Sequence, residues 1–232
     1  MTSLRLSVAA AGAAILLSTA MLGQISAASA AEGVRVPPPA FSTPATAPAE
    51  TAIFAGGCFW GVQGVFAHVK GVKSAVSGYA GGDRATANYE AVGSGRTGHA
   101  EAVRVTFDPR VVSYAQLLQV YFSVVADPTQ LNYQGPDRGP QYRGALFPTT
   151  AQQKAVATRY IAQLGKAGVW KRPIVTRIEP ATSFYAAEAY HQDYFWENPN
   201  SGYIRMHDVP KVKALKAFYP GLWRDRPALV KG

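Results

Sequence analysis

Apolar and polar side chains alternate most regularly between residues 99 and 107. The apolar positions are Val103, Val105 and Phe107, and the side chains between them are small, charged or hydroxylated. This period of two is typical of a strand with one face toward the core. Counting back two residues from Val103 places Glu101 on the apolar face. The strand therefore directs a carboxylate toward the core, unless its end is frayed and Glu101 reaches solvent.

Similar spacing predicts the other elements of an α+β domain. The predicted strands span residues 53–55, 72–79, 99–107, 143–147 and 174–178. The predicted helices span residues 62–69, 113–125, 150–164, 184–196 and 212–218. Two polar loops, 80–98 and 127–142, separate some of these elements. The alternation in strand 99–107 implies that one face of the sheet is more exposed to water than the other. This favours a mixed sheet with helices mostly on one side, an α/β sandwich, over a doubly wound parallel sheet.

Chemistry-bearing side chains also lie on two of the predicted helices. Tyr114 and Tyr121 fall on the apolar face of helix 113–125, so we interpret them as packing residues. Glu188 and His191 are three residues apart in helix 184–196 and would share one face, where we expect structural support.

The only cysteine of the chain, Cys58, lies in the segment Gly-Gly-Cys-Phe-Trp-Gly at residues 56–61. A strand precedes this segment and a helix follows it, so Cys58 is expected at a helix N-terminus. Unpaired N–H groups and the helix dipole would favour the thiolate there. The flanking glycines would keep the sulfur uncovered. The alternative is a small buried apolar residue, as lone cysteines often are.

The N-terminal segment predicts export. Arg5 precedes an apolar run, and Ala28-Ser29-Ala30 fits a cleavage site. We interpret residues 1–30 as a signal peptide cut near Ala30/Ala31, with a membrane anchor as the alternative if it stays uncut. Residues 31–50, rich in Pro and Ala, predict a mobile linker. We then expect a catalytic domain at residues 51–202. We also expect a C-terminal extension at residues 203–232 that packs on that domain.

The charge and the histidine content of the chain limit the classes of function that it can have. The net charge is +9, but the cations are scattered and do not interleave with aromatics, which argues against nucleic-acid binding. The four histidines show no metal-ligand spacing, so no metal site is expected. A single cysteine excludes an intramolecular disulfide. We expect a monomer.

Four segments together resemble the motifs of one family, the peptide methionine sulfoxide reductases of the A type. These segments are GCFWG at 57–61, GHAE at 98–101, DRGPQYR at 137–143 and AEAYHQDY at 187–194. They occur in the family's order. The resemblance implies a ferredoxin-like α/β sandwich and reduction of the S-epimer of methionine sulfoxide, free or within oxidised proteins.

The resemblance also implies roles in the reaction. Cys58 would attack the sulfoxide sulfur, and Glu101 would protonate the sulfoxide oxygen. Tyr89 and Tyr142 would donate hydrogen bonds to that oxygen. This division suits the chemistry, because a sulfoxide is a weak electrophile until its oxygen gains a proton.

Three more residues would bind the substrate. Phe59 and Trp60 would hold the methyl group against an aromatic wall. Asp137 would hold the polar part of the substrate. Taken alone, Tyr89 and Tyr142 would more often be ordinary packing residues of their loops.

The sequence departs from the family in its tail. Many relatives have further cysteines after an Asn-Pro-x-Gly-Tyr stretch, but here Tyr203 is followed by Ile204 and no thiol. A sulfenic acid on Cys58 would then need an external thiol, from a thioredoxin-like donor or a small molecule, with no bound cofactor. Arg138 and Gly144 stand where relatives often have His and Ser.

Two other functions compete with this interpretation. A single-cysteine thiol peroxidase would use similar sulfur chemistry, but it needs a cation beside the thiolate, where this chain has aromatics. A non-catalytic binding module would use the same aromatic pocket without a nucleophile. Retained activity after Cys58→Ser would favour binding or another nucleophile.

Overall fold

The structure is a computed structural model that describes residues 33–45, 47–180 and 183–231. The predicted signal peptide at residues 1–30 lies outside the described residues. No helix in the described part combines the length and the apolar character that a membrane crossing requires.

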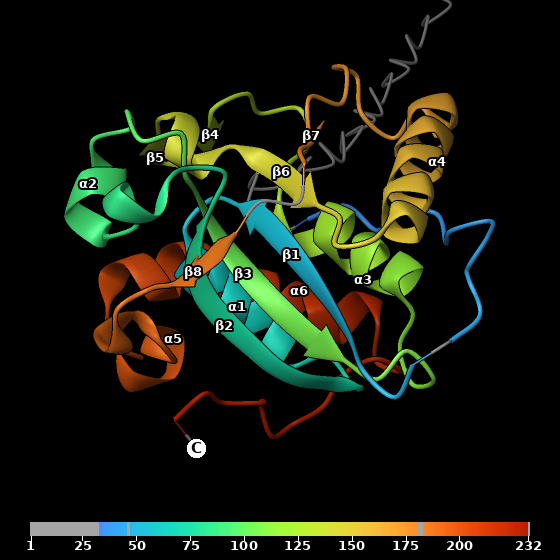
Figure 1. The fold of residues 1–232 in the computed structure, drawn as a ribbon. Helices are drawn as coiled ribbons and strands as arrows, with labels where there is room; N and C mark the ends of the chain where they lie inside the picture. The colour runs from blue at the N-terminus through green and yellow to red at the C-terminus, as the bar shows by residue number, and fades with distance from the viewer. Residues whose placement is uncertain (1–32, 46, 181–182, 232) are drawn as a thin grey trace, which may run out of the picture.

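A six-stranded mixed sheet forms the centre of the fold (Figure 1). Its strands lie in the order β7-β6-β1-β3-β2-β8, and all neighbours pair antiparallel except β6 and β7. Their bounds are β1 Glu50–Gly56, β2 Val72–Ala80, β3 Ala100–Phe107, β6 Gly144–Phe147, β7 Arg177–Ile178 and β8 Phe184–Ala186.

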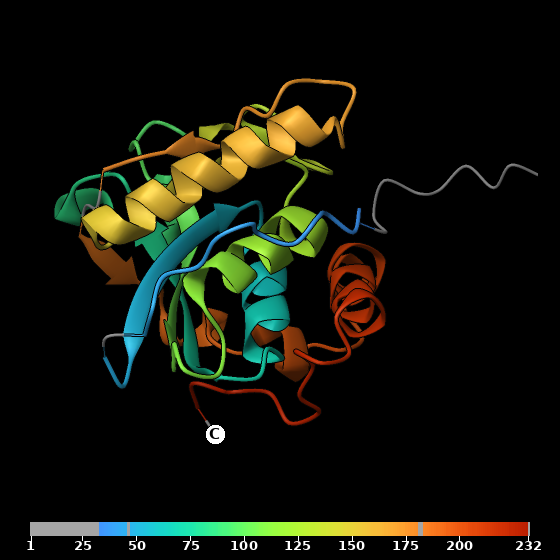
Figure 2. The same ribbon diagram turned by 90° about the vertical axis from the view of Figure 1, so that its right-hand side faces the viewer.

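The α-helices of the described residues are α1 Phe59–Ala67, α2 Tyr89–Gly93, α3 Tyr114–Val120, α4 Ala151–Ala167, α5 Tyr194–Glu197 and α6 Val209–Phe218. Of these, α1, α3 and α6 lie on one side of the sheet (Figure 2). In Figure 2 the strands lie toward the left, α1 and α3 lie to their right, and α6 forms an outer layer beyond α1. The predicted α+β sandwich with a mixed sheet and flanking helices is confirmed.

Helix α3 forms as its sequence predicts. Ser113 and Gln116 make a reciprocal capping box at its start, which satisfies two backbone N–H groups. The helix then continues as a π-helical turn, η2, over Tyr121–Val125. Tyr114 and Tyr121 are buried, and both rings pack against Phe54 of β1. Their predicted packing role is confirmed.

The predicted helix over 184–196 is wrong. Residues Phe184–Ala186 instead form β8 on the edge of β2, followed by the 3-10 turn η4 (Ala189–His191) and the single turn α5. The buried Gln192 amide binds both the N–H and the C=O of Ser77 on β2. Asp193 then adopts a left-handed conformation with φ 58°. These long-range bonds override the helical spacing of the apolar residues.

Residues 33–41 differ from the mobile linker that the sequence predicts. Val36 is only 2% exposed. The N–H of Val34 donates to the Ser123 carbonyl at 2.8 Å, and the Tyr160 hydroxyl donates to the Pro37 carbonyl at 2.6 Å. Extended prolines leave their carbonyls free, and η2 and α4 supply the donors and the apolar surface that bind this segment.

Several smaller elements also differ from the sequence prediction. Loop 80–98 contains the 3-10 turn η1 (Arg84–Thr86) and helix α2. Loop 127–142 contains a hairpin of the strands β4 (Tyr133–Gln134) and β5 (Asp137–Arg138), followed by the 3-10 turn η3 (Pro140–Tyr142). The strand predicted over 174–178 is limited to β7. Helix α6 begins at Val209, earlier than predicted, and follows the π-helical turn η5 (Ile204–Asp208).

The residues after 203 lie against the rest of the fold. Helix α6 packs on α1 (Figure 2). The Trp223 ring stacks on His68 with centroids 4.3 Å apart. The Asp193 carboxylate accepts hydrogen bonds from the N–H groups of Val230 and Lys231. These contacts tie the C-terminal residues to the segment that carries the fourth motif.

Candidate active site

Cys58 is the N-cap residue of α1, as predicted. Strand β1 ends at Gly56, and Gly57 turns the chain with φ 91°, a conformation that glycine adopts without strain. A Cβ on Gly57 would lie 2.7 Å from the Cβ of Gln134. The turn therefore requires glycine at this position. It leaves the cysteine only 7% exposed, in contrast to the uncovered sulfur that we expected.

Glu101 projects from β3 toward the core, so the core-facing alternative is the one observed. Glu101 is 3% exposed, and its Oε2 accepts a hydrogen bond of 3.0 Å from the Phe59 N–H in the first turn of α1. Burial, assisted by the charges of Asp137 and Asp208, raises the pKa of Glu101 to about 8 despite that hydrogen bond. The carboxyl group thus holds a proton at neutral pH.

The Cys58 thiol is not activated in the way that its helix position suggests. Burial raises the pKa of Cys58 well above its ordinary value, and the charges of Glu101 and Asp208 add to this effect. The Trp60 N–H acts in the opposite direction but does not prevail. The expected low pKa is therefore wrong for the free site, because desolvation outweighs the helix terminus.

Asp208 is a site residue that the sequence did not reveal. It is fully buried at the end of η5, and neither carboxylate oxygen has a hydrogen-bond partner among the described residues. The Lys211 ammonium lies 3.8 Å from its Oδ1. The carboxylate presses against Gly61 of α1, where a Cβ would overlap it. Burial raises the pKa of Asp208 to about 6.

Tyr89 and Tyr142 reach the same site from two loops. Tyr89 begins α2, is 40% exposed and donates its N–H to Glu188 Oε1 at 2.9 Å. Tyr142 ends η3 and is half-buried. Burial raises the pKa of Tyr142, and the charges of Glu101, Asp137 and Cys58 raise it further. The Tyr89 ring centroid lies 4.4 Å from that of His191, a ring that also packs against Phe59. Both phenols remain protonated donors at neutral pH.

The aromatic pair beside Cys58 is held by the fourth motif. Phe59 is fully buried, and its ring centroid lies 5.0 Å from that of His191. Trp60 stacks on Tyr194 at 3.9 Å and donates its indole N–H to His191 Nδ1 at 3.2 Å. Glu188 binds the Tyr79 hydroxyl as well as the Tyr89 N–H. These contacts provide the structural support that we expected of Glu188 and His191, although no single helix carries both residues.

Asp137 is paired with a second residue that the sequence did not single out. The Tyr203 hydroxyl donates a 2.5 Å hydrogen bond to Asp137 Oδ2. The Tyr203 ring also meets Trp60 edge-on at 5.9 Å. Its only signal in the sequence is its place directly after the Asn-Pro-x-x-Gly stretch. The pair forms one wall of the site.

Arg143 ties the second motif to the third. Its guanidinium is buried, pairs with Glu179 at 2.7 Å and donates to the carbonyls of Gly98 and His99. It thereby fixes the entry to β3, where Glu101 lies, relative to the loop of Tyr142. Arg138 instead lies over the Tyr133 ring at 4.3 Å, on the exposed side of the hairpin.

The described residues contain no cluster of three or more His, Cys, Asp or Glu side chains that would hold a metal ion. The groups that surround Cys58 are carboxyls, phenols and aromatic rings, which suits acid-assisted chemistry at a sulfur atom.

Comparisons with known proteins agree with this arrangement. Residues 50–220 match the family model described as peptide methionine sulfoxide reductase. A relative named peptide methionine sulfoxide reductase MsrA 2, from Mesorhizobium japonicum, is 60% identical over 181 residues, which cover 78% of this chain and 93% of the relative. The MsrA of Deinococcus radiodurans is 52% identical over 170 residues, covering 73% and 82%.

Solved structures extend the similarity to the fold. Reduced Mxr1 from Saccharomyces cerevisiae has a TM-score of 0.61 at 32% identity and covers 72% of this chain and 96% of its own. Methionine sulfoxide reductase A of Corynebacterium diphtheriae has a TM-score of 0.57, also at 32% identity, covering 72% and 85%. The chain therefore belongs to the peptide methionine sulfoxide reductase A family and is a peptide-methionine (S)-S-oxide reductase.

Proposed function

We propose that Cys58 is the nucleophile and Glu101 the acid of this reduction. The observation that carries the proposal is the placement of a buried, protonated carboxyl group next to the only thiol of the chain. Glu101 Oε2 is engaged by the Phe59 N–H, so Oε1 is free to carry the proton toward a substrate. Both groups then act on one sulfoxide.

In the proposed reaction, the Cys58 sulfur attacks the sulfoxide sulfur while Glu101 protonates the sulfoxide oxygen. Tyr89 and Tyr142 donate hydrogen bonds to that oxygen and stabilise its developing charge. The thiol proton returns to the Glu101 carboxylate. The hydroxyl then moves to the Cys58 sulfur while the transient bond between the two sulfur atoms and the substrate S–O bond break. This gives a sulfenic acid and methionine, so the enzyme is oxidised as the substrate is reduced.

An apolar wall and a polar wall of the site would together orient the substrate. Trp60 offers apolar surface to the methyl group, and Phe59, fully buried against His191, packs behind that surface. The phenols and Glu101 face the oxygen. The Asp137 carboxylate, fixed by Tyr203, is placed to accept a hydrogen bond from the polar part of the substrate. Because methyl and oxygen must meet different walls, only one configuration at sulfur fits.

Resetting the enzyme requires two external thiols. The first thiol condenses with the Cys58 sulfenic acid, which releases water and forms a mixed disulfide. The second thiol then frees Cys58 and leaves as a disulfide with the first. The 232 residues contain no other cysteine that would act as resolving thiol. We propose a thioredoxin-like donor or a small thiol in this role.

A single-turnover assay tests the scheme. Enzyme with excess methionine-S-sulfoxide and no thiol should form about one methionine per Cys58, and turnover should start when dithiothreitol is added. Cys58→Ser should form none while keeping its fold by circular dichroism. Sustained turnover without thiol would contradict the single-cysteine scheme, and activity in Cys58→Ser would contradict the assigned nucleophile.

We further propose that the protein works in the periplasm or outside the cell as a monomer. The support is the pattern of residues 1–30, with its basic start, apolar run and small residues at the cleavage site. Intact mass of the protein from fractionated cells should show a chain that begins near Ala31. An uncut chain in the membrane fraction would indicate the anchored form instead. Size-exclusion chromatography tests the monomer.

A further inference from the structure

Asp208 is a buried carboxylate whose position no structural contact explains. It is fully buried, and neither of its oxygens has a hydrogen-bond partner among the described residues. It is the N-cap residue of α6, yet its side chain does not cap that helix. A buried charge without hydrogen bonds costs folding free energy, so such a group calls for a functional explanation.

The Asp208 carboxylate occupies the place of a side chain on α1. Cys58 is the N-cap of this helix, which makes Gly61 its third residue, N3. A Cβ on Gly61 would overlap Asp208 Oδ1. In a capping box the side chains of the N-cap and N3 residues lie next to each other. Turn η5 therefore supplies, from outside the helix, the carboxylate that a capping box carries at N3, and places it beside a cysteine.

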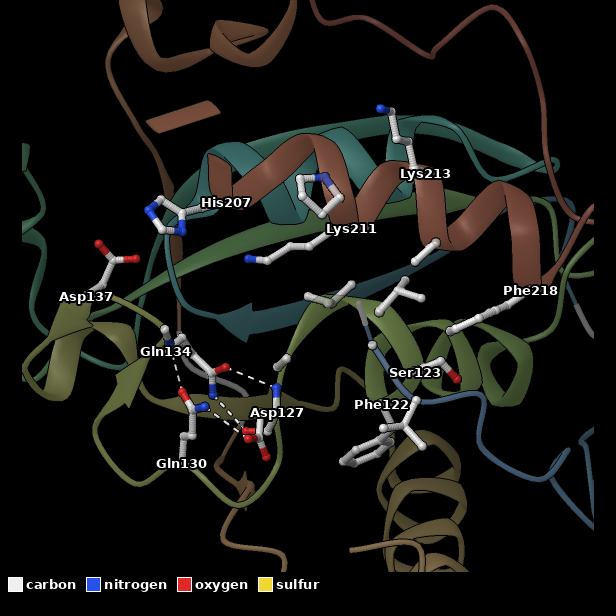
Figure 3. A pocket seen from close by; sticks show the side chains of 18 of the residues that line it. Phe122, Ser123, Asp127, Gln130, Gln134, Asp137, His207, Lys211, Lys213 and Phe218 are labelled. Carbon is white, nitrogen blue, oxygen red and sulfur yellow. Dashed lines mark hydrogen bonds between the residues drawn. The ribbon is translucent and has the colours of Figure 1, made fainter. Parts of the chain in front are cut away.

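Lys211 compensates this negative charge only in part. Its ammonium lies 3.8 Å from Asp208 Oδ1, and its side chain is 20% exposed, whereas that of Asp208 is fully buried. The Lys211 side chain extends into a cavity of about 970 Å³ between α6, η2 and the loop that precedes β5 (Figure 3). Asp137 and Tyr203 of the catalytic site also line this cavity. The cation thus lies toward the cavity, and the carboxylate lies against α1.

Titratable groups from several elements surround Asp208. They are Cys58 at the start of α1, Glu101 on β3, Asp137 on β5, Tyr203 before η5 and Lys211 on α6. Burial raises the pKa of Asp208 to about 6, so the group is charged at neutral pH. This charge disfavours both a thiolate on Cys58 and a carboxylate on Glu101.

Two kinds of reaction at Cys58 respond differently to a fixed negative charge. Attack on a peroxide needs the thiolate, because the sulfur bonds one oxygen, the O–O bond breaks and hydroxide leaves. In the proposed attack on a sulfoxide, the thiol proton replaces the one that Glu101 gives to the sulfoxide oxygen, so the site gains no net charge. A negative charge beside Cys58 therefore slows the first reaction much more than the second.

We propose that Asp208 is a positioning residue that determines specificity: its charge beside the start of α1 holds Cys58 as a thiol in the empty site and so restricts it to sulfoxides. The proposal rests on the proposed function of Cys58. Peroxides and disulfides, which react with thiolates, meet a sulfur of low reactivity. The buried charge that weakens the fold is thus explained by the selectivity that it provides.

The reaction of Cys58 with dithiodipyridine tests this charge in the native protein, because the reagent consumes the thiolate and releases a coloured thiopyridone. Without a neighbouring titration, the logarithm of the rate rises by one per pH unit below the pKa of the thiol. With Asp208, the rise should stop near pH 6 and resume about one to two units higher, because its ionisation makes the thiolate about 10- to 100-fold rarer. A uniform slope from pH 5 to pH 8 would overturn the proposal.

Asp208→Asn removes the charge and keeps the shape of the side chain. The interruption near pH 6 should disappear. At pH 7, oxidation of Cys58 by hydrogen peroxide should gain about 10- to 100-fold relative to single-turnover reduction of methionine-S-sulfoxide. Asp225→Asn, at an exposed carboxylate of the same C-terminal segment, is the matched control and should keep the native profile and ratio. The ratio is measured within each variant, so a general change in activity does not affect it.

An interruption that persists in Asp208→Asn would overturn the proposal. An unchanged ratio of the two rates would indicate a purely structural role for Asp208 and would also overturn it. If Asp208→Asn does not fold, the pH profile of the native protein decides alone. Failure of the proposed function looks different, because Cys58→Ser would then retain reduction of the sulfoxide.

Discussion

Glu101 and Cys58 show how burial sets the protonation of individual residues. In both, desolvation is the largest cause of a raised pKa, and both therefore keep their protons at neutral pH in the free enzyme. A protonated acid suits the activation of a sulfoxide oxygen. A protonated thiol implies that nucleophile and acid act together on bound substrate, because neither is charged beforehand.

The pH dependence of a single turnover tests Glu101. Because its pKa is raised to about 8, the acid form is complete below about pH 7 and is lost as the pH rises through 8. The rate of methionine formation should be flat at lower pH and fall about tenfold per unit above 8. Rapid-quench measurements across this range would show it.

Glu101→Gln should lower that rate about 100- to 10,000-fold and remove most of its pH dependence. Glu90→Gln, at an exposed position of α2, is the control and should retain the native profile. An unchanged rate in Glu101→Gln would exclude this residue as the acid.

Asp208 should weaken the folded state at alkaline pH. Its pKa is raised to about 6 by burial, above the ordinary value of about 4. The stability that the protonated Asp208 contributes is therefore fully present below about pH 4 and is lost as the pH rises through 6. Asp208→Asn should increase Tm relative to the native protein more at pH 8 than at pH 4.5, in thermal unfolding followed by circular dichroism. An equal change at both pH values would contradict a buried Asp208 that becomes charged as the pH rises through 6.

At the scale of elements, helix α1 connects the thiol to the rest of the site. Its first turn presents Cys58 as N-cap and donates the Phe59 N–H to Glu101. Gly61, which is also buried near the start of α1, allows Asp208 to approach. The absence of a side chain at Gly61 is thus what lets η5 pack on the start of α1.

Gly61→Ala should destabilise the protein by about 1–3 kcal/mol, because the new Cβ would overlap the Asp208 carboxylate. The matched control is Gly165→Ala in α4, where nothing lies within 4 Å of an added Cβ. This change should stabilise the helix by about 0.5–1 kcal/mol. Urea unfolding of the two variants gives both values, and destabilisation of equal size in both would contradict the close approach at Gly61.

At the scale of the whole molecule, segments from both ends of the described chain complete the domain. Residues 33–41 lie on η2 and α4, and η5 with α6 covers α1 (Figure 2). Two of these segments, 33–34 and α6, also form walls of the cavity that adjoins the site. The walls of that cavity therefore come partly from segments that lie outside the four motifs.

Val36→Ala tests whether the N-terminal segment belongs to the folded unit. Val36 is 2% exposed, so its truncation should lower the free energy of unfolding by about 1–3 kcal/mol. Val34→Ala, at a position that is 44% exposed in the same segment, should have little effect. Equal stabilities of the two variants would indicate that the segment does not contribute to folding.

Short-range patterns in the sequence were sufficient for the centre of the site. A two-residue period placed Glu101 on the core face of β3, and glycines between a strand and a helix placed Cys58 at the start of α1. The same reasoning failed between residues 184 and 196, because long-range bonds to β2 decided that backbone. It also missed Tyr203, whose role depends on Asp137, 66 residues away.

By itself, the sequence determined the family, the mixed sheet and the number of thiols, since motifs, periodicity and cysteine count are properties of the chain alone. Only the tertiary structure decided the protonation of Cys58, the presence of Asp208 beside it, the docking of residues 33–41 and the cavity next to Asp137. Each of these depends on burial and on charge acting through space between distant segments. Such effects have no period or spacing in the sequence, because they arise only when the chain is folded.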